Sequence, residues 1–391
     1  MRSPAYVGLR IFCSPQRNIQ GNTMSRTFFP FCILFALSMT TATASDSPAP
    51  AQPSPETVLV IGHRGASALV PEHTLASYLK AIEDGADWIE PDLVSTRDGV
   101  LVARHENEIG STTDVALHPE FADRRRKKVI DGQPAEGWFT EDFSLTELRT
   151  LRVRERLPQL RSHALDGQFS IPTLEEIIQL VTEEAKARGR IIGLVPEIKH
   201  PTHFQSIGLP MEDRLLDVLH SHAYTRTAPV VIQSFEIANL KYLGERIRAS
   251  GSHIQLLQLL GDPAQQPGDV LATGQGPSYA QMMTLEGLQD IAGYASHVGP
   301  HTRMIIPLDD TGALGTPTSL VNDAHAAGLR VIAYTFRPEN YFLPRTLWSG
   351  EDPRTRNEAG SVAEIRVYLQ TGIDGFFTDD PAIGRLAVDE D

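Results

Sequence analysis

The sequence predicts an α/β protein that folds as a (β/α)8 TIM barrel, with a lobe inserted after a hairpin that follows the second strand. Eight short apolar runs recur along the chain, and segments with helical spacing of apolar residues separate several of them. The side chains best suited to catalysis follow the ends of these runs, where barrel enzymes place their active sites. A doubly wound sheet usually stops at about five or six strands, so the barrel is favoured.

The composition is that of an ordinary globular protein. Of 391 residues, 41% are hydrophobic and 21% are charged, which excludes a disordered chain, a collagen and a coiled coil. The formal net charge is −14. Binding to a phosphate backbone requires clustered positive charge, so no nucleic-acid partner is expected.

Residues 1–44 have the pattern of a secretory signal peptide. Met24 is the natural start of this leader, because a short basic stretch there precedes the apolar run Thr27–Met39. Small residues before Ser45 predict cleavage near Ala44–Ser45, and hence a periplasmic or secreted protein. The apolar run is shorter than the roughly 20 residues that span a bilayer, so no stable membrane anchor is expected. The alternative interpretation is a buried N-terminal helix.

Cleavage there would remove both cysteines and leave a short spacer ahead of the folded domain. Cys13 and Cys32 lie in the leader, so the exported chain would have no disulfide, thiolate nucleophile or cysteine zinc site. Residues 45–56 consist mostly of Pro, Ala and Ser, and we expect an extended spacer. The folded domain is predicted to run over residues 57–391, with an insertion at about 106–170.

The predicted parallel strands follow one another through the domain, each an apolar run rich in β-branched or aromatic residues. They are Val58–Ile61, Trp88–Val94, Ile191–Ile198, Val230–Gln233, Ile254–Leu260, Ser296–Val298, Val331–Thr335 and Gly375–Thr378. Between the early strands, Thr74–Ile82 and Leu174–Val181 carry apolar residues at helical spacing. Alternation of strands with helical segments is what a parallel barrel requires.

One further apolar run, Val100–Arg104, comes too soon after the second strand to be its parallel neighbour. A parallel crossover needs a dozen or more residues, and only Ser95–Gly99 separates the two runs. We therefore expect an antiparallel hairpin with Asp98–Gly99 at the turn. Such a hairpin would return His105 to the end of the second strand.

The insertion of residues 106–170 has a charged, irregular texture and is predicted to form a lobe over the mouth of the barrel. Within it, Arg124–Lys128 could attract an anion. A solvated run of charges is the favoured interpretation, because adjacent side chains rarely converge on one point.

Residues that carry chemistry gather at the predicted strand ends. His63 and Arg64 follow the first strand, Glu90 and Asp92 end the second, and His105 ends the hairpin. Glu197 and Lys199 stand at the end of the strand Ile191–Ile198. In a barrel, the carboxyl ends of the strands meet around one mouth, so we expect these side chains to lie close together.

The acidic residues of this set predict a metal site. Glu90 and Asp92 are two positions apart and would share one face of a strand, and Glu197 would join them. Three carboxylates repel one another unless a cation lies between them, and oxygen ligands favour Ca²⁺ or Mg²⁺ over zinc. The alternative is that the acids form salt bridges with Arg64 and Lys199. Proline in a strand lacks the ladder donor, so the second strand should bulge or end near Glu90.

A metal beside two histidines and two fixed cations suggests phosphoryl chemistry. His63 and His105 would transfer protons, while the metal, Arg64 and Lys199 would stabilise the charge on phosphate oxygens.

Taken together, the motifs of the chain resemble those of the glycerophosphodiester phosphodiesterase family. The resemblance rests on motifs in the order Gly62–Ser67, Pro71–Leu75, Glu90–Asp92, Thr96–His105, Pro196–Lys199, Gln233–Phe235, Ala333–Phe336 and Gly375–Asp379. The leader and the insertion, with its segment Gly137–Phe143, are similar to the periplasmic branch of that family. The resemblance implies a barrel that hydrolyses glycerophosphodiesters to sn-glycerol 3-phosphate and an alcohol, with one divalent cation, Ca²⁺ ahead of Mg²⁺.

The resemblance also implies roles for individual residues. His63 and His105 would be the catalytic acid and base, and Arg64 and Lys199 would contact phosphate. The metal ligands would be Glu90, Asp92 and Glu197. Glu72 and Phe336 would be further substrate-binding residues of the pocket.

The expected mechanism uses the 2-hydroxyl of the substrate's glycerol as an internal nucleophile, giving a cyclic phosphate that water then opens. The expected partner is a small glycerophosphodiester, with no obligate protein partner. One rival is a phospholipase D-like or phosphatidylinositol-cleaving barrel that acts on whole lipids. Another is an exported binding protein or adhesin that has lost catalysis, although no histidine or carboxylate of the set is missing.

Overall fold

The structure is a computed structural model, and it describes residues 58–389. The predicted signal peptide at 1–44, its cleavage near Ala44–Ser45, the two cysteines and the spacer at 45–56 lie outside the described residues.

The barrel is confirmed, and its strands pair in parallel around a closed ring. Its strands are β1 (Leu59–His63), β2 (Trp88–Glu90), β3 (Asp92–Ser95), β7 (Gly193–Leu194), β8 (Glu197–Ile198), β9 (Val231–Ser234), β10 (Gln255–Leu260), β11 (His297–Pro300), β12 (Arg330–Phe336) and β13 (Gly375–Thr378). Two predicted strands are each interrupted, giving the pairs β2/β3 and β7/β8. The ring closes because β1 pairs with β2 on one side and β13 on the other.

Prolines cause the two interruptions. Pro91 and Pro196 have no N–H to donate, but their carbonyl oxygens still accept bonds across the barrel. Pro91 accepts from the Glu197 N–H at 2.9 Å, and Pro196 accepts from the Gln233 N–H at 2.9 Å. The bends thus occur where Glu90, Asp92 and Glu197 face the barrel mouth, and they leave the order of the strands unchanged.

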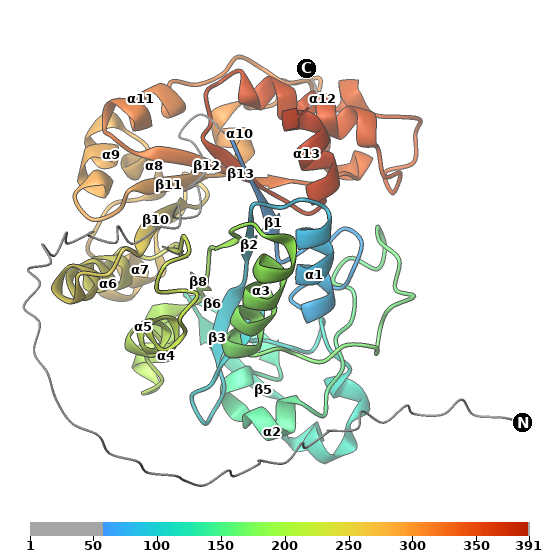
Figure 1. The fold of residues 1–391 in the computed structure, drawn as a ribbon, viewed down its shortest axis with the longest axis vertical. Coiled ribbons are helices and arrows are strands. Elements are labelled where there is room, and N and C mark those ends of the chain that lie inside the picture. Colours follow the sequence, from blue (N-terminus) through green and yellow to red (C-terminus); the bar gives the residue numbers. More distant parts are fainter. Residues whose placement is uncertain (1–57, 390–391) are drawn as a thin grey trace, which may run out of the picture. The chain divides into compact units, whose positions relative to one another are not determined.

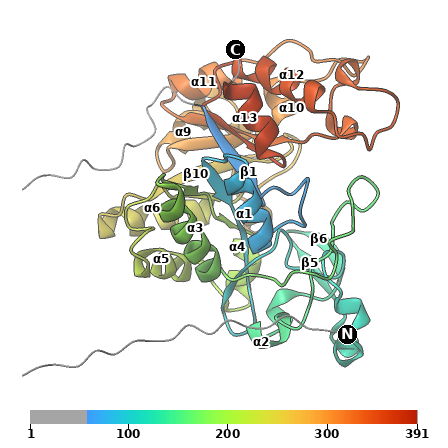
Figure 2. The same ribbon diagram turned by 45° about the vertical axis from the view of Figure 1, so that its right-hand side comes forward.

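Helices surround the barrel (Figures 1 and 2). The longer ones are α1 (Leu75–Glu83), α3 (Leu174–Arg188), α5 (Glu212–Ser221), α6 (Ile237–Ser250), α9 (Leu285–Ala292), α11 (Leu320–Ala326), α12 (Glu358–Leu369) and α13 (Pro381–Asp389). The shorter ones are α4 (Pro201–Ser206), α7 (Gly268–Thr273), α8 (Tyr279–Met282) and α10 (Thr302–Ile305). Thr74 and Thr173 begin α1 and α3 by accepting backbone N–H bonds with their side chains, as N-cap residues do. Among the described helices, none has the length and apolar character needed to cross a membrane.

Two sets of apolar side chains fill the domain. A small set inside the barrel includes Ile61, Leu257, Ile332 and Phe377. A larger set lies between the strands and the surrounding helices. These layers hold the strand ends in fixed positions, so the side chains at the mouth are carried on a rigid scaffold.

The expected hairpin is present, with β4 (Leu101–Ala103) antiparallel to β3. Its turn lies one residue earlier than expected: the Gly99 N–H donates to the Thr96 oxygen, and Gly99 follows the turn at a φ of 76°. This three-residue loop is the form in which a turn ends in a left-handed glycine. The Arg104 N–H then donates to the Asp92 oxygen at 3.0 Å, which returns His105 to the second strand.

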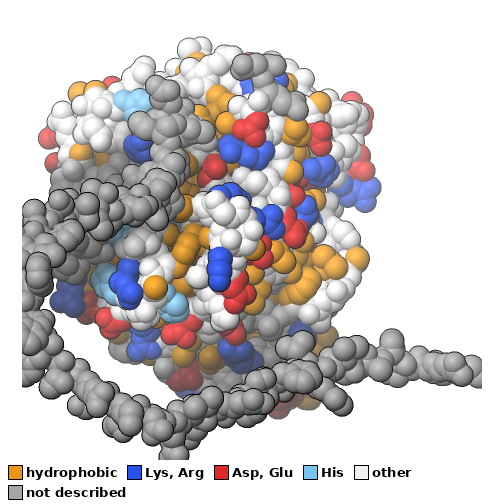
Figure 3. All heavy atoms as spheres, in the orientation of Figure 1, with side chains coloured by type: hydrophobic (Ala, Val, Ile, Leu, Met, Phe, Trp, Pro, Cys, Tyr) orange, Lys and Arg blue, Asp and Glu red, His pale blue; other side chains and the backbone are white. Residues whose placement is uncertain are grey.

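Residues 106–170 form short helices, α2 (Leu145–Leu148) and a hairpin of β5 (Arg126–Ile130) with β6 (Gln133–Gly137). In Figures 1 and 2 these elements gather at the lower end of the view, away from α11 and α12. The basic run lies largely in β5 and is mostly exposed, and its charges pair with acids such as Glu136 and Glu141. In Figure 3, basic and acidic side chains are interspersed over the described part of the visible face.

Candidate active site

A cavity of about 280 Å³ lies at the carboxyl ends of the strands. It is lined by His63, Arg64, Glu90, His105, Glu197, Gln233, Phe235, Leu259, Tyr334, Thr335, Arg337 and Phe377. The structure therefore brings together residues that are up to 314 positions apart in the sequence, because they stand on or next to several different strands of the barrel.

Glu90, Asp92 and Glu197 form the cluster that the sequence predicted as a metal site. One carboxylate oxygen from each lies within 4.8 Å of the others, and all three side chains are buried. Two buried oxygens, Asp92 Oδ1 and Gln233 Oε1, have no hydrogen-bond partner among the described residues. A buried acceptor without a donor is costly, and a cation would satisfy it. The residues present thus fit a hard divalent ion with oxygen ligands.

The electrostatics of the cluster support the same fit. Burial and the neighbouring carboxylates raise the pKa of Glu90 well above its usual value. Burial, acting with Asp92 and against Lys199, raises the pKa of Glu197 to about 8. Asp92 is also buried, but Lys199, His105 and His73 hold its pKa well below the usual range. Without a cation, the three acids therefore cannot all be ionised near neutral pH.

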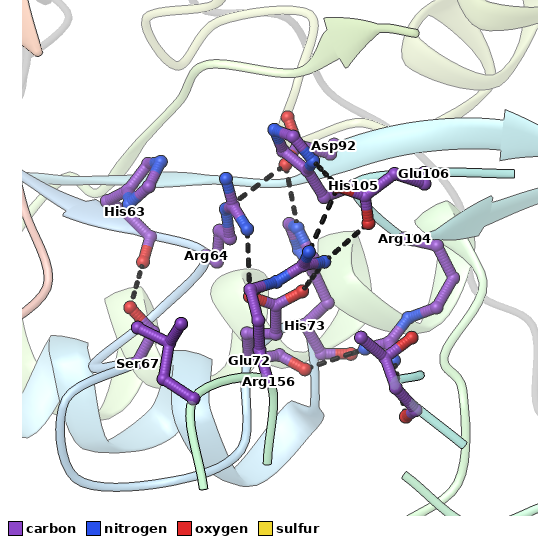
Figure 4. Close-up of polar contacts among 12 residues, drawn as sticks. His63, Arg64, Ser67, Glu72, His73, Asp92, Arg104, His105, Glu106 and Arg156 are labelled. Carbon is purple, nitrogen blue, oxygen red and sulfur yellow. Dashed lines mark hydrogen bonds and ion pairs between the residues drawn. The ribbon is translucent and has the colours of Figure 1, made fainter. Parts of the chain in front are cut away.

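Neighbouring residues hold Asp92 and Glu90 in place, and Figure 4 shows Asp92 beside His73. Asp92 Oδ2 lies 2.9 Å from His73 Nε2, and the other ring nitrogen of His73 lies 2.7 Å from the Tyr78 hydroxyl. The Arg64 N–H donates to Glu90 at 2.8 Å, and Gln233 Nε2 donates to Glu90 at 3.0 Å. Such supporting contacts orient carboxylates for metal binding.

The two predicted phosphate contacts, Arg64 and Lys199, lie on either side of the acids. Arg64 has a φ of 59°, and this conformation directs its N–H to Glu90 while its guanidinium reaches the cavity. Lys199 donates to Glu197 at 2.7 Å. Glu72 does not line the cavity; it accepts from Arg64 at 2.8 Å, so it positions that side chain.

His63 is coupled to a carboxylate that sequence reasoning did not single out. Its Nδ1 lies 2.5 Å from Asp379 Oδ1, which leaves Nε2 for the cavity. Asp379 Oδ2 accepts from Arg161 at 2.6 Å and from Arg337 at 3.1 Å. Burial and Arg64 lower the pKa of His63 to about 4, against the opposing effect of Asp379. His63 is thus a neutral imidazole with a fixed tautomer.

His105 has a matching arrangement (Figure 4). Its Nδ1 lies 2.5 Å from Glu106 Oε1, and Glu106 Oε2 accepts from Arg156 at 2.7 Å. Arg156 also donates to Glu72 at 2.6 and 2.7 Å. Burial, Arg64 and Lys199 lower the pKa of His105 to about 3. The insertion therefore supplies one arginine to each histidine–carboxylate pair.

Phe336 requires a correction, because the structure places it in the core rather than in the cavity. Its side chain is 1% exposed, and its ring packs edge-on against Tyr368 and Phe376 at 5.1 and 5.3 Å. Ile332 and Tyr334 face the barrel interior, so strict alternation would turn Phe336 inward as well. The register of β12 shifts between Ala333 and Phe336, and this irregularity reverses the direction.

Sequence reasoning missed five residues of the site: His73, Glu106, Arg156, Arg161 and Asp379. Asp379 and His73 lie within the motifs that carry the family resemblance. Asp379 follows the end of a strand and His73 follows Glu72, and these positions could have indicated both residues. Arg156 and Arg161 lie in the irregular insertion. Arg161 contacts Asp379, which is 218 positions away in the sequence, so no local pattern indicated these arginines.

Comparison with known proteins gives a consistent result. Residues 63–383 match a family model described as the glycerophosphoryl diester phosphodiesterase family. A glycerophosphodiester phosphodiesterase of Arabidopsis thaliana is 34% identical over 333 residues, which are 82% of this chain and 82% of that protein. One of Haemophilus influenzae is 30% identical over 343 residues, covering 81% and 89%. An Oleispira antarctica phosphodiesterase, solved with the product sn-glycerol-3-phosphate, shares the fold, with a TM-score of 0.52, 20% identity, and coverage of 85% and 98%.

Proposed function

The chain belongs to the glycerophosphoryl diester phosphodiesterase family, and we propose that it hydrolyses glycerophosphodiesters to sn-glycerol 3-phosphate and an alcohol. The observation that carries the proposal is the acidic cluster between two histidines, each bound to its own carboxylate. Two imidazoles beside a cation site can provide a base in the neutral form and an acid in the protonated form for cleavage of a phosphodiester.

We propose that Glu90, Asp92 and Glu197 hold one divalent cation, with Ca²⁺ preferred over Mg²⁺. Three carboxylates and no nitrogen or sulfur donor match the hard cations, and Ca²⁺ tolerates irregular oxygen geometry better than Mg²⁺. When bound, the cation would stabilise negative charge on the phosphate and make a bound hydroxyl more acidic.

The remaining side chains bind and orient the substrate and transfer protons. Arg64 and Lys199 would hold the phosphate oxygens, since both are fixed by carboxylates at the edge of the acidic cluster. His63 has Nε2 left for the cavity, and Nε2 of His105 lies 3.3 Å from Lys199 Nζ. One histidine would remove a proton and the other would protonate the leaving alcohol.

We propose that the proton is removed from the 2-hydroxyl of the substrate's glycerol, which then attacks phosphorus to give a cyclic phosphate. A tethered nucleophile gains several kcal/mol of effective concentration, and the described lining of the cavity contains no serine or cysteine. An analogue that lacks only the 2-hydroxyl should turn over negligibly. Similar rates for both substrates would contradict internal attack while leaving the phosphodiesterase intact.

We also propose that the protein is exported to the periplasm or secreted, as in the periplasmic branch of the family. The support is the composition of residues 1–44, with the apolar run Thr27–Met39 and small residues before Ser45. N-terminal sequencing of the protein from the culture's periplasmic and medium fractions tests this. A mature protein that keeps residues 1–44 would contradict it.

The proposed activity is tested by its dependence on metal. Hydrolysis of glycerophosphocholine should stop after treatment with EDTA and return when Ca²⁺ is added back. Parallel additions of Mg²⁺ and Mn²⁺ identify the preferred ion. Full activity in metal-free protein would contradict the assignment of the acidic cluster, and restoration by Mg²⁺ alone would contradict the preference for Ca²⁺.

A further inference from the structure

A second cavity, of about 600 Å³, adjoins the catalytic one. The two cavities share Glu197 and Phe235 in their walls, so these side chains lie between them. The second cavity lies past the ends of β8, β9 and β10, and the β5–β6 hairpin contributes Asp131 of its turn and Gln133 of β6 to the wall. The inserted lobe and the barrel thus enclose it together.

Glu236 is the main polar group of this second cavity. It is 3% exposed, and its carboxylate accepts hydrogen bonds only from the backbone and hydroxyl of Thr202. Among residues 58–389, no lysine, arginine or histidine forms an ion pair with it. An ionised carboxylate that is buried without a cation is costly, so Glu236 either stays protonated or binds a cation that enters the cavity.

Asp131 faces the same space as Glu236. A Cβ on Gly268 would lie 2.7 Å from Glu236 Oε1 and 3.2 Å from Asp131 Oδ1, so both carboxylates lie against this bare Cα. A larger side chain at this position would have to displace these carboxylates.

The two basic residues in the wall of the cavity are each bound to an acid, and one of these acids is Asp131 itself. Lys199 donates to Glu197 at 2.7 Å, and His200 Nδ1 lies 2.6 Å from Asp131 Oδ2. Asp269 at the start of α7 adds negative charge near Glu236. The part of the wall that Glu236 and Asp131 form is therefore electronegative.

Aromatic and apolar side chains complete the wall. Phe235 and Tyr279 pack edge to face with their centroids 6.4 Å apart, and Leu271 lies in the same wall. Aromatic faces beside carboxylates are the surroundings that ammonium and quaternary ammonium groups prefer.

We propose that the second cavity binds the positively charged end of the leaving alcohol, an ammonium or quaternary ammonium group. The inference rests on the proposed function, because it places the glycerol and phosphate in the catalytic cavity and the alcohol beyond Phe235. The enzyme would then prefer glycerophosphodiesters of amino alcohols over those of neutral alcohols.

The test compares kcat/KM for glycerophosphocholine, glycerophosphoethanolamine and the neutral-alcohol substrate glycerophosphoglycerol, with saturating metal. Wild type should favour the two cationic substrates. In Glu236→Gln this preference should fall about tenfold or more, as expected for loss of a buried contact to a charged group. Asp131→Asn should lower the same ratio, and asparagine tolerates the φ of 47° at this position.

Glu136→Gln is the matched control, because Glu136 lies on the same β5–β6 hairpin as Asp131, is exposed and does not line the second cavity. Its substrate ratio should equal that of wild type. A second readout is competitive inhibition by choline alone, which should weaken in both cavity variants.

Three outcomes separate the possibilities. An unchanged ratio in both Glu236→Gln and Asp131→Asn, with wild-type inhibition by choline, would overturn this inference and leave the phosphodiesterase activity standing. Equal kcat/KM values of the wild type for all three substrates would also overturn this inference and leave the phosphodiesterase activity standing. Failure of the metal-loaded wild type to hydrolyse any of them would overturn the proposed function and this inference with it.

Discussion

Asp379→Asn tests the coupling of His63 to its carboxylate. The substitution keeps the shape of the side chain but removes the charge that faces His63 Nδ1 at 2.5 Å. Hydrogen bonds to a charged group are worth about 1.5–3 kcal/mol, which corresponds to a fall in kcat of roughly 10- to 150-fold. The pKa of His63 should also fall, because Asp379 raises it, and the corresponding limb of the pH–rate profile should move to lower pH.

The substitution also affects stability, since Asp379 accepts from the buried Arg161 and from Arg337. Activity should therefore be measured well below the thermal transition of the variant. Asp374→Asn is the matched control, because Asp374 precedes strand β13 whereas Asp379 follows it. Asp374 accepts a hydrogen bond from His325 at 2.9 Å, far from the cavity. It should change stability and leave kcat unaffected.

A double-mutant cycle decides whether Asp379 acts through His63. In a His63→Ala background, Asp379→Asn should cost little further activity, because the group it positions is already gone. Equal losses in both backgrounds would refute the coupling. So would a folded Asp379→Asn enzyme with the kcat and pH profile of wild type.

Three further predictions concern other parts of the molecule. His63→Ala and His105→Ala should each lower kcat by about 100-fold or more with an unchanged thermal transition, and near-normal turnover would remove that residue from the mechanism. Arg156→Gln should lower kcat/KM by about tenfold, because Glu72 and Glu106 lose a shared partner, whereas the exposed Arg126→Gln should not. Burial raises the pKa of Glu236 to about 8, above its usual value of 4.5. The protonated form of Glu236 therefore stabilises the fold at low pH, and this stabilisation is lost as the pH rises through 8. Thermal melts at about pH 6 and pH 9 should therefore show Glu236→Gln gaining stability relative to wild type at the higher pH, and an equal difference at both values would contradict the burial of this acid.

Much of the fold was predictable from local patterns. Strands buried on both faces are apolar runs, and each predicted run, including Ser296–Val298, overlaps a strand of the barrel. The return of Val100–Arg104 followed from chain length alone, because five residues cannot complete a parallel crossover. The turn differed by one residue, since Gly99 adopts its left-handed conformation after the turn and not within it.

The parts of the site that lay in strand-end motifs were also predictable. Spacing placed Glu90 and Asp92 on one face, and Glu197 was expected to join them from the end of another strand; the structure brings one oxygen of each within 4.8 Å of the others. The assignment of Phe336 to the pocket was wrong because it depends on the shift of register in β12, which spacing does not reveal. Arg156 and Arg161 could not be found, because they act through contacts between distant segments of an irregular insertion.

Identification of the products of glycerophosphocholine hydrolysis tests the central claim most directly. Phosphorus NMR of the metal-loaded enzyme with this substrate distinguishes cleavage of the two ester bonds. The geometry of the site and the membership of the family predict sn-glycerol 3-phosphate, with free choline released in equal amount and no phosphorus signal from phosphocholine. Formation of phosphocholine and glycerol, or no change in the phosphodiester signal, would contradict the account.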